Sequence, residues 1–484
     1  MIDTQAIRKK ILDLALQGKL TEQLPEDGMA ELQYQQIQPA IQVSIKIENS
    51  DRKQLSVLSE KETLFDIPST WIWVHIGDLF SHNTGKALKK SDTTGRKLTY
   101  ITTSNVYWDR FELNSLKTMH FQDDEIEKCT VKKGDLLVCE GGDIGRSAIW
   151  PFDSEIRIQN HIHKLRKRNK NVHTKFYYYV MLNYKYNNLI RGQGIGLEGF
   201  SSKRLHNLVV PFPPFDEQAR IVDRIDSAFE VLKQLDTLQG QYQDNLAILK
   251  SKIIDAGIQG QLTEQLPEDG TEEELYQQIQ QEKLALEKAG KIKKSKPLSS
   301  ISEEEKLFDL PDNWKWVRFA DLMLSISTGP FGSMLHKSDY VNKGIPLVNP
   351  MNIVEGKIVP SDKMMVSENT KSRLSPYILH EGMIVMGRRG EMGRCAIINH
   401  EEDGWLCGTG SFFMKPSSFL FVQYIALLLS TTYAKTYLGG QSIGMTMSNL
   451  NHKILARMPV PLPPLAEQKR IVAKLEELLP LCEG

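Results

Sequence analysis

The sequence predicts an α+β fold: two similar α+β domains, separated by long antiparallel coiled-coil-like helices and related as a pseudo-two-fold internal repeat. Three observations support this fold class. Four sequence segments recur in the same order in both halves of the 484-residue chain. Between the halves, apolar residues fall every three or four positions, as in an amphipathic helix. Inside each half, short strand-like runs alternate with Gly-rich turns.

The internal repeat is long, and its order is preserved. The first copies are 17–28 (QGKLTEQLPEDG), 64–74 (LFDIPSTWIWV), 133–149 (KGDLLVCEGGDIGRSAI) and 211–225 (PFPPFDEQARIVDRI). Their second copies begin 242, 243, 248 and 250 residues later, respectively. A period of this length is one domain plus one connector, and it excludes a short-repeat solenoid.

The central connector has the pattern of a long helix. We expect it to run from Glu217 to Ala256, with Asp216 as its N-cap and with Gly257 and Gly260 ending it. Both termini carry the same apolar spacing, so the C-terminal helix should pack on the central helix and the N-terminal helix should extend that packing. The predicted helix-packing residues are Ile7, Ile11, Leu14, Ile221, Ile225, Leu232, Leu235, Leu246, Leu249, Ile253, Ile471, Leu475 and Leu478.

Each domain interior is expected to mix strands and helices. The predicted strands are 98–103, 135–139, 148–150, 161–165 and 208–211 in the first copy, and 346–349, 383–386 and 396–398 in the second. Helices are expected at 175–186 and 422–433. Trp71, Trp73, Trp314 and Trp316, at matching positions of the two copies, are expected to be core or platform residues and not base-stacking residues. The chain then divides into an N-terminal helical arm and linker (1–63), a first domain (64–215), a central helix and linker (216–306), a second domain (307–465) and a C-terminal helix (466–484).

The zero net charge of the chain conceals a segregation of charge between domains and connectors. Residues 81–215 contain 22 Lys or Arg and 13 Asp or Glu, a net charge of +9. Residues 324–465 contain 13 and 9, a net charge of +4, and the remainder carries −13. Basic domains on acidic arms favour binding of a polyanion by the domains. For a single run such as Lys164–Lys170, a solvated face is the favoured interpretation.

Several catalytic classes find little support in the sequence. The segment 349–352 (NPMN) lacks the second proline and the aromatic residue of an adenine-methyltransferase motif, and neither Gly-rich turn matches a phosphate-binding loop. Glu355-Gly356-Lys357 lacks the upstream Pro-Asp pair of a nuclease site. The histidines and five cysteines show no metal-ligand spacing, so no metal site is expected. With no signal peptide or apolar span, a cytoplasmic location is expected.

The recurring segments resemble those of a known family. The P-[FL]-P-P-[FL]-x-E-Q-x-R-I-V segments at 211–222 and 461–472, the two L-F-D-[IL]-P-x-x-W-x-W-V segments and the basic run 290–294 (GKIKK) are similar to the specificity subunits of type I restriction-modification systems, over the whole chain. The first copy departs from this pattern at 39–58, where the second has its basic run.

The resemblance implies a non-catalytic subunit with two target-recognition domains, each reading half of a split, asymmetric site in double-stranded DNA. Helical regions would hold the domains apart and bind two methyltransferase (modification) subunits, and motor-nuclease (restriction) subunits would join. S-adenosylmethionine, ATP and Mg²⁺ are then expected on the partners and not on this chain, and no membrane is involved. The base sequence and spacer length of the DNA site are not evident from these residues.

Candidate DNA contacts are polar side chains in or near turns, where arginine suits phosphate or guanine. The family offers no invariant base-reading residue to carry over, so position alone selects them, and each could equally belong to a surface turn. They are Thr84, Lys86, Lys89, Lys90, Ser104, Asn105, Arg146 and Gln193 in the first domain, and Ser333, Lys337, Asn352, Arg388, Arg389, Arg394 and Gln441 in the second.

Three other functions stay open at this stage. One is a stand-alone tandem-domain DNA-binding regulator without restriction partners, which genomic neighbours would distinguish. Another is a methyltransferase or nuclease with a degenerate motif, whose methyltransferase form requires binding of S-adenosylmethionine. The third is a scaffold without DNA, which the charges of the two domains disfavour.

Overall fold

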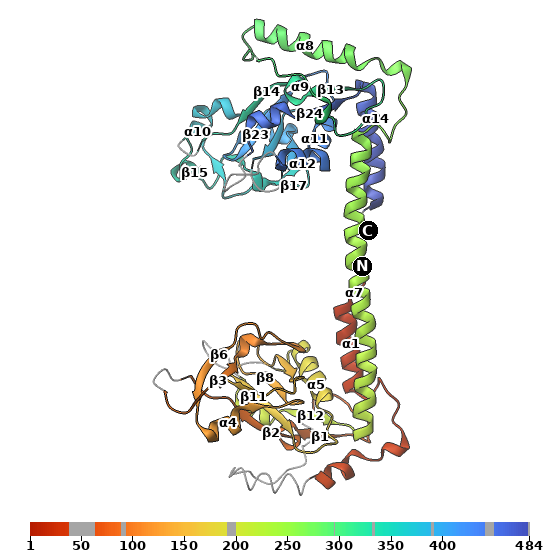
Figure 1. Cartoon of the computed structure of the whole chain (residues 1–484), viewed down its shortest axis with the longest axis vertical. Helices are drawn as coiled ribbons and strands as arrows, with labels where there is room; N and C mark the ends of the chain where they lie inside the picture. Colours follow the sequence, from red (N-terminus) through yellow and green to blue (C-terminus); the bar gives the residue numbers. More distant parts are fainter. Residues whose placement is uncertain are drawn as a thin grey trace. The chain divides into compact units, whose positions relative to one another are not determined.

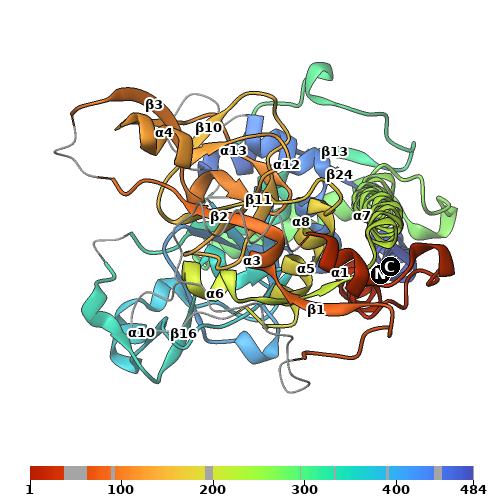
Figure 2. The ribbon, with the colours of Figure 1, turned by 90° about the horizontal axis from the view of Figure 1, so that it is seen from below.

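The computed structural model describes residues 1–37, 63–88, 93–190, 200–294, 296–331, 334–388, 392–440 and 450–482 (Figure 1). The chain forms two compact units, Met1–Gln239 and Gly240–Gly484. Each unit combines small sheets with helices, which confirms the predicted α+β class. One helix, α7 (Phe215–Ile258, 44 residues), contributes to both units and is seen end-on in Figure 2.

The first unit has three layers. A four-stranded sheet of order β2-β11-β8-β9 lies between helix α5 and a second sheet of order β6-β3-β10-β7. The elements are α1 (Thr4–Leu16), β1 (Ile72–His75), α3 (Ile76–Leu79), β2 (Phe80–Thr84), β3 (Arg96–Ile101), β4 (Val106–Tyr107), β5 (Arg110–Phe111), β6 (Lys117–Phe121), α4 (Asp123–Cys129), β7 (Thr130–Val131), β8 (Leu136–Cys139), β9 (Ser147–Ile149), β10 (Ile156–Ile158), β11 (Ile162–Lys167), α5 (Thr174–Tyr186), α6 (Ser202–His206) and β12 (Val209–Phe212).

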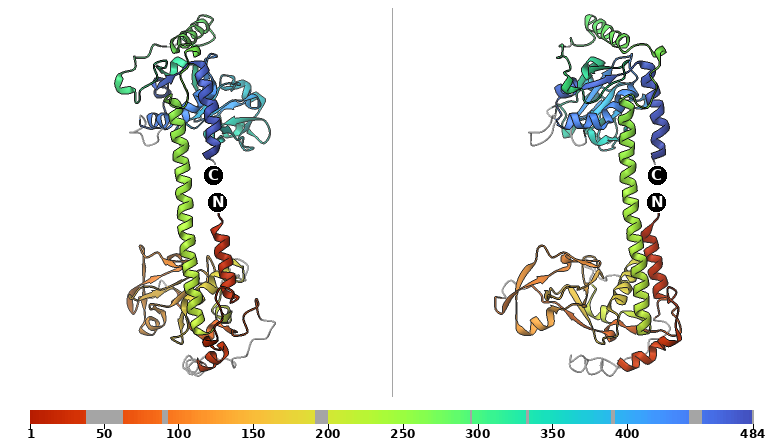
Figure 3. Two further views of the ribbon diagram at one scale, coloured as in Figure 1. Left: turned by 90° about the vertical axis from the view of Figure 1, so that its right-hand side faces the viewer. Right: turned by 45° about the vertical axis from the view of Figure 1, so that its right-hand side comes forward.

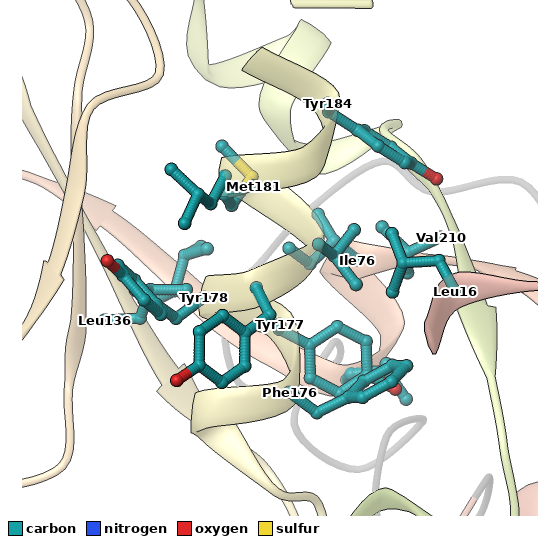
Figure 4. Packing of buried hydrophobic residues seen from close by; sticks show 14 of the residues in the cluster. Leu16, Ile76, Leu136, Phe176, Tyr177, Tyr178, Met181, Tyr184 and Val210 are labelled. Carbon is teal, nitrogen blue, oxygen red and sulfur yellow. The ribbon is translucent and has the colours of Figure 1, made fainter. Parts of the chain in front are cut away.

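Strand β8 shows why this sheet is buried on both faces. Successive side chains of a strand point to opposite faces. Leu136 and Val138 therefore join the core that contains α5, shown in Figure 4, whereas Leu137 and Cys139 join the core beneath the second sheet. This is why the run LLVC is apolar at every position and does not alternate.

The second unit repeats this plan. Its four-stranded sheets have the orders β14-β23-β20-β21 and β15-β19-β16-β22, and β20 sends alternate side chains into two cores. The elements are α8 (Glu272–Lys288), β13 (Lys315–Arg318), α9 (Phe319–Leu322), β14 (Met323–Thr328), β15 (Tyr340–Val341), β16 (Ile345–Val348), β17 (Ile353–Val354), β18 (Lys357–Ile358), β19 (Met365–Val366), α10 (Glu368–Arg373), β20 (Ile384–Gly387), β21 (Cys395–Ile397), β22 (Leu406–Cys407), β23 (Ser411–Pro416), α11 (Val422–Ser430), α12 (Thr432–Gly440), α13 (His452–Arg457), β24 (Pro459–Leu462) and α14 (Leu465–Leu478).

The predicted strands all occur, within about two residues of their expected ends, but three helix boundaries differ. The single helix expected at 422–433 is two helices that meet at Thr431. Helix α7 begins at Phe215, so Asp216 lies in its first turn and is not the N-cap. Gly257 lies inside α7, where its missing side chain allows Ile471 and Leu475 of α14 to approach.

Each terminal helix packs on α7 within its own unit. Figure 3 shows α1 alongside α7, where Thr4 and Arg8 both bond to Asp236, at 2.5 and 2.8 Å. In the second unit, α14 packs against the end of α7 through Ile471 and Leu475. The N- and C-terminal helices therefore follow the predicted packing in outline.

The predicted packing residues differ in burial. Ile221, Ile225, Leu232, Ile471 and Leu475 are buried, and Ile11, Leu14, Leu235, Leu246, Ile253 and Leu478 are half-buried. Ile7 and Leu249 are exposed, so their prediction as packing residues does not hold in this structure. In α1 the buried positions are instead Thr4, Leu12, Ala15 and Leu16, because this helix packs on α5 as well as on α7.

The recurring E-Q-x-R sequence at the start of α7 connects this helix to several other segments of the first unit through hydrogen bonds. The buried carboxylate of Glu217 accepts hydrogen bonds from Trp71 (2.7 Å) and Gln23 (2.9 Å). Gln218 donates to the Pro213 carbonyl (2.8 Å) and accepts from the backbone N–H that precedes α5 (3.0 Å). We call Glu217, Gln218 and Arg220, with these partners, the first clamp.

Arginine completes the clamp. The guanidinium of Arg220 forms a two-pronged ion pair with Asp27 (2.7 and 2.5 Å) and holds the pKa of that carboxyl below its usual range. Gly18, in the turn before Asp27, has φ of +65°, and a side chain there would collide with Pro68. The first and last recurring segments are therefore structural.

The second unit contains the same clamp. Glu467 accepts from Trp314 (2.8 Å) and Gln265 (2.9 Å), Gln468 bonds to the Pro463 carbonyl (2.9 Å), and Arg470 pairs with Asp269. Trp71 and Trp314 are buried as predicted, whereas Trp73 and Trp316, predicted alongside them, are half-buried.

We expect Gly240→Ala to stabilise the chain by up to about 1 kcal/mol, because glycine is a poor helix former and the new methyl group meets no atom within 4 Å. Urea unfolding would measure the gain. Gly257→Ala is the matched control in the same helix, where the added carbon would lie 3.1 Å from Leu475. An equal gain from both substitutions would contradict the packing described for α14.

Candidate nucleic-acid interface

In the first unit, the Gly-rich turn between β8 and β9 is where the predicted DNA-contact segments meet. At the start of the turn, the N–H of Glu140 donates to the carbonyl of His161 (2.9 Å). That residue lies beside the segment after Thr84, because the N–H of Gly85 donates to Ile162. At its other end, the Arg146 guanidinium donates to the Thr103 carbonyl (2.6 Å), next to Ser104.

The corresponding turn of the second unit is joined to its neighbours by similar backbone hydrogen bonds. The N–H of Arg388 donates to the Gly410 carbonyl (2.8 Å), and the N–H of Leu450 donates to the Arg388 carbonyl (3.1 Å). The last bond has a counterpart in the first unit, where the N–H of Phe200 donates to Glu140 (2.8 Å). We call the region around Glu140 and Arg146 the first recognition edge and the region around Arg388 the second. Each brings together segments that are distant in sequence.

The structure gives Lys86 a role within the fold in place of the predicted DNA contact. Its side chain is 8% exposed, and Nζ donates to the His120 carbonyl (2.8 Å) and to the Glu125 carboxylate (2.7 Å). Lys86 therefore joins β6 and α4 to the strand end that carries Thr84. Its charge is neutralised inside the domain.

Asn105 and Asn352 also have structural roles. The Asn105 amide accepts from the N–H of Thr102 (2.9 Å) and donates to the Glu112 carbonyl (2.8 Å). Asn352 makes the equivalent bonds, from Asn349 (3.0 Å) and to the carbonyl of residue 359 (2.9 Å). Both are buried and stabilise matching turns, so neither amide is presented for base recognition.

Three of the predicted arginines, Arg146, Arg388 and Arg394, lie at the recognition edges. Arg146 lies over the ring of Tyr107, 5.1 Å from its centre, and Arg388 lies over Phe412 at the same distance. The Nε atoms of Arg146 and Arg394 are buried and have no hydrogen-bond partner among the described residues. Both arginines are half-buried, so part of each side chain faces solvent.

Much of the basic run Lys164–Lys170 is bound within the fold. Lys164 is 2% exposed, and its Nζ donates to the carbonyls of Lys128 and Thr130 at the end of α4 (2.7 and 2.8 Å). Burial lowers the pKa of Lys164 to about 8. Arg166 forms an ion pair with the buried Asp135 (2.6 Å). These two charges are therefore not available for an external polyanion.

Comparison with known families explains this duplicated arrangement. The family model described as type I restriction modification DNA specificity domain matches the chain twice, at residues 68–239 and 311–482. The chain belongs to this family. Each match contains one recognition edge and the start of the helix that carries the E-Q-x-R sequence of the clamp, α7 or α14.

Curated relatives are similar over nearly the whole length. The specificity subunit of type I restriction enzyme EcoEI from Escherichia coli is 25% identical, covering 99% of this chain and 89% of its own. The EcoAI specificity subunit, also from Escherichia coli, is 26% identical with 98% and 89% coverage. The chain is thus a type I specificity subunit, a non-catalytic component of a restriction-modification system.

Solved structures share the fold. A chain from work on assembly and conformational transition of the type I restriction-modification system is 18% identical, with a TM-score of 0.58 over 87% of this chain and 92% of its own. The HsdS subunit from Thermoanaerobacter tengcongensis is 17% identical, with a TM-score of 0.50 and the same two coverages. At these identities the likeness concerns the fold alone.

Three further predicted contacts of this specificity subunit are described, and one of them, Ser104, shares a hydrogen bond with the Thr102 hydroxyl (2.7 Å). Ser104 and Lys337 are exposed, and Thr84, at the end of β2, is half-buried. Their contact with DNA stays a prediction. Lys89, Lys90, Gln193, Ser333, Arg389 and Gln441 lie outside the described residues.

Sequence reasoning missed three residues beside the recognition edges of the specificity subunit: Tyr107 and Arg110 on the hairpin β4–β5, and Lys357 on the hairpin β17–β18. The repeat itself could have indicated two of them. Arg110 and Lys357 are separated by 247 residues, within the drift of the repeat offset, and both are basic.

In the part of the chain that the structure describes, no group of three or more His, Cys, Asp or Glu side chains is placed to hold a metal ion. Nor does any helix in those ranges have the length and apolar character needed to cross a membrane.

Proposed function

We propose that this specificity subunit binds a bipartite site in double-stranded DNA, with one half read by each domain, and recruits methyltransferase and restriction subunits to it. The observation that carries the proposal is the duplicated recognition edge: each unit brings a Gly-rich turn and its arginines, Arg146 in one and Arg388 and Arg394 in the other, beside segments that are distant in sequence. Direct base readout needs such polar side chains at the surface of a rigid element.

The charge distribution supports DNA as the ligand. Both domains are basic, with net charges of +9 and +4, although Lys86, Lys164 and Arg166 are neutralised or bonded inside the first domain. DNA binding that depends on the remaining lysines and arginines releases counterions, so the affinity should fall steeply with salt.

Helix α7 offers surfaces for the methyltransferase subunits. In the first unit its exposed apolar residues are Val231 and Leu238, with exposed fractions of 63% and 61%. In the second unit they are Tyr242, Ile248 and Leu249, at 54%, 53% and 46%. Large apolar side chains exposed along one helix are typical of a protein-binding surface. Two such stretches would serve two methyltransferase subunits.

The chemistry would then belong to the partners. S-adenosylmethionine would bind the methyltransferase subunits, and ATP and Mg²⁺ would bind the motor-nuclease subunits. The specificity subunit itself would act in the cytoplasm, where chromosomal DNA is accessible to the assembled complex.

Deleting the gene for this chain should remove methylation at one bipartite sequence throughout the genome, and restoring it should bring that methylation back. Single-molecule sequencing of native DNA would measure both effects. The purified chain alone should bind DNA with steep salt dependence and transfer no methyl groups. An unchanged methylation pattern, together with altered transcription of nearby genes, would instead support a stand-alone DNA-binding regulator.

A further inference from the structure

A short hairpin beside the first recognition edge carries an aromatic ring and a basic side chain on one face. In hairpin β4–β5, Val106 is opposite Phe111 and Tyr107 is opposite Arg110. Residues directly opposite in an antiparallel pair share a face. Val106 is buried, so Tyr107 and Arg110 lie on the outer face. The Arg110 guanidinium lies over the Tyr107 ring, 4.7 Å from its centre.

A second guanidinium lies over the same ring. Arg146, from the neighbouring Gly-rich turn, is 5.1 Å from the centre of the Tyr107 ring and is held by its bond to the Thr103 carbonyl. Within the described ranges, neither Arg110 nor Arg146 has a carboxylate partner. Two cations without a carboxylate partner beside one ring leave positive charge at this place that is not neutralised within the fold, and such charge attracts an anion.

The second unit has basic residues at the positions of Arg110 and Arg146 but no aromatic residue at the position of Tyr107. In hairpin β17–β18, Val354 is opposite Lys357, so these residues occupy the places of Tyr107 and Arg110. The hairpin packs against β21, which begins one residue after Arg394, the counterpart of Arg146. Lys357 is exposed, and it too is without a carboxylate partner among the described residues.

We propose that each hairpin, together with the arginine of its Gly-rich turn, binds a backbone phosphate of the DNA. This inference rests on the proposed function and adds the residues of one sequence-independent contact in each domain. The two domains would read different half-sites, yet both keep a cation on the hairpin and an arginine on the turn. A feature that two differently specific domains share suits the phosphate backbone, which carries no sequence information.

The chemistry of the first site fits a phosphate. Arginine presents N–H donors in a planar fork that matches two phosphate oxygens. Stacking on Tyr107 restricts the Arg110 side chain before DNA binds, so less conformational entropy is lost on binding. The half-buried Arg146 guanidinium lies over the same ring and is held by the Thr103 carbonyl. Arg110 and Lys357 are the contacting residues, and Tyr107 is a positioning residue.

The test uses the full-length chain and fluorescence anisotropy with duplex DNA at several salt concentrations. For R110Q and for K357Q we expect about tenfold weaker binding to every duplex, including unrelated sequences. The plot of log affinity against log salt should become less steep, by about 0.9 for each variant and by about 1.8 for the double variant. Y107L should weaken binding while retaining the wild-type slope, because no charge is removed.

Lys133→Gln is the matched control, since Lys133 is exposed and lies at the opposite end of β8 from the Gly-rich turn. A change in slope for R110Q no larger than for K133Q would overturn the inference. So would a loss confined to one base pair of the site, which would make Arg110 a base-reading residue. Wild-type binding that is absent or independent of salt would instead refute the proposed function itself.

Discussion

Replacing Glu217 by alanine should destabilise the first unit by about 2–4 kcal/mol, the largest effect on stability that we expect from a single substitution. The Glu217 carboxylate is completely buried and accepts hydrogen bonds from Trp71 and Gln23, which lie on two other segments of the unit. Alanine would leave the buried indole N–H of Trp71 without an acceptor, which costs about 1–3 kcal/mol, whereas the exposed Gln23 amide keeps its bond to the Gly18 carbonyl. It would also remove a negative charge near Arg220 and the positive end of the α7 dipole.

Hydrogen exchange measured by mass spectrometry would locate the effect. Protection should be lost across β1, α1 and the start of α7, while the second unit keeps its protection. Glu467→Ala is the matched variant and should show the reverse. Glu217→Gln keeps one carboxamide oxygen and should lose less stability. Equal loss of protection in both units after either alanine substitution would contradict the independence of the two clamps.

Exchanging the first domain for that of a relative should change half of the recognised sequence and leave the other half unchanged. Each recognition edge is built from one unit alone, so the donor domain brings all of its own contacts. Methylation at the original site should fall to the level of non-specific binding, at least ~10³-fold, because specific and non-specific DNA affinities commonly differ by that much. Genome-wide methylation sequencing would show the hybrid site directly.

The structure also indicates where to join the two proteins. A junction between residues 80 and 81 would divide β2, whereas junctions at 75/76 and 208/209 leave the paired strands β1 and β12 and the first clamp intact. The spacer should stay constant in such a hybrid, because α7 is unchanged. A hybrid in which both half-sites change would show that the domains read DNA jointly.

The repeat and its long helix could be predicted because their signals are strong and local. The helical spacing of apolar residues predicted α7 to within two residues at each end. The recurring segments indicated equivalent structures in both halves, and the clamps confirm this. Burial of Trp71 and Trp314 followed from their matching places beside an apolar strand.

The missed features depend on contacts between distant segments. Ile7 carries the right spacing, but α1 turns another face inward because α5 covers it. The sequence around Lys86 predicted a surface cation, but in the fold α4 places Glu125 beside it. Tyr107 and Arg110 lie in strands of two residues each, too short to show any periodicity. Charge alone therefore identified two basic domains but could not separate exposed cations from those bonded within the fold.

The two clamps have an evolutionary consequence. Each joins its domain to the helices through the same few side chains, none of which belongs to a recognition edge. Substitutions at an edge therefore leave the clamp intact, and a domain that carries compatible strand ends could be inherited in either position. A lineage with this architecture could acquire a new target sequence through one recombination event between the halves or with a relative. The folding stability and the partner-binding helices would be preserved through that event.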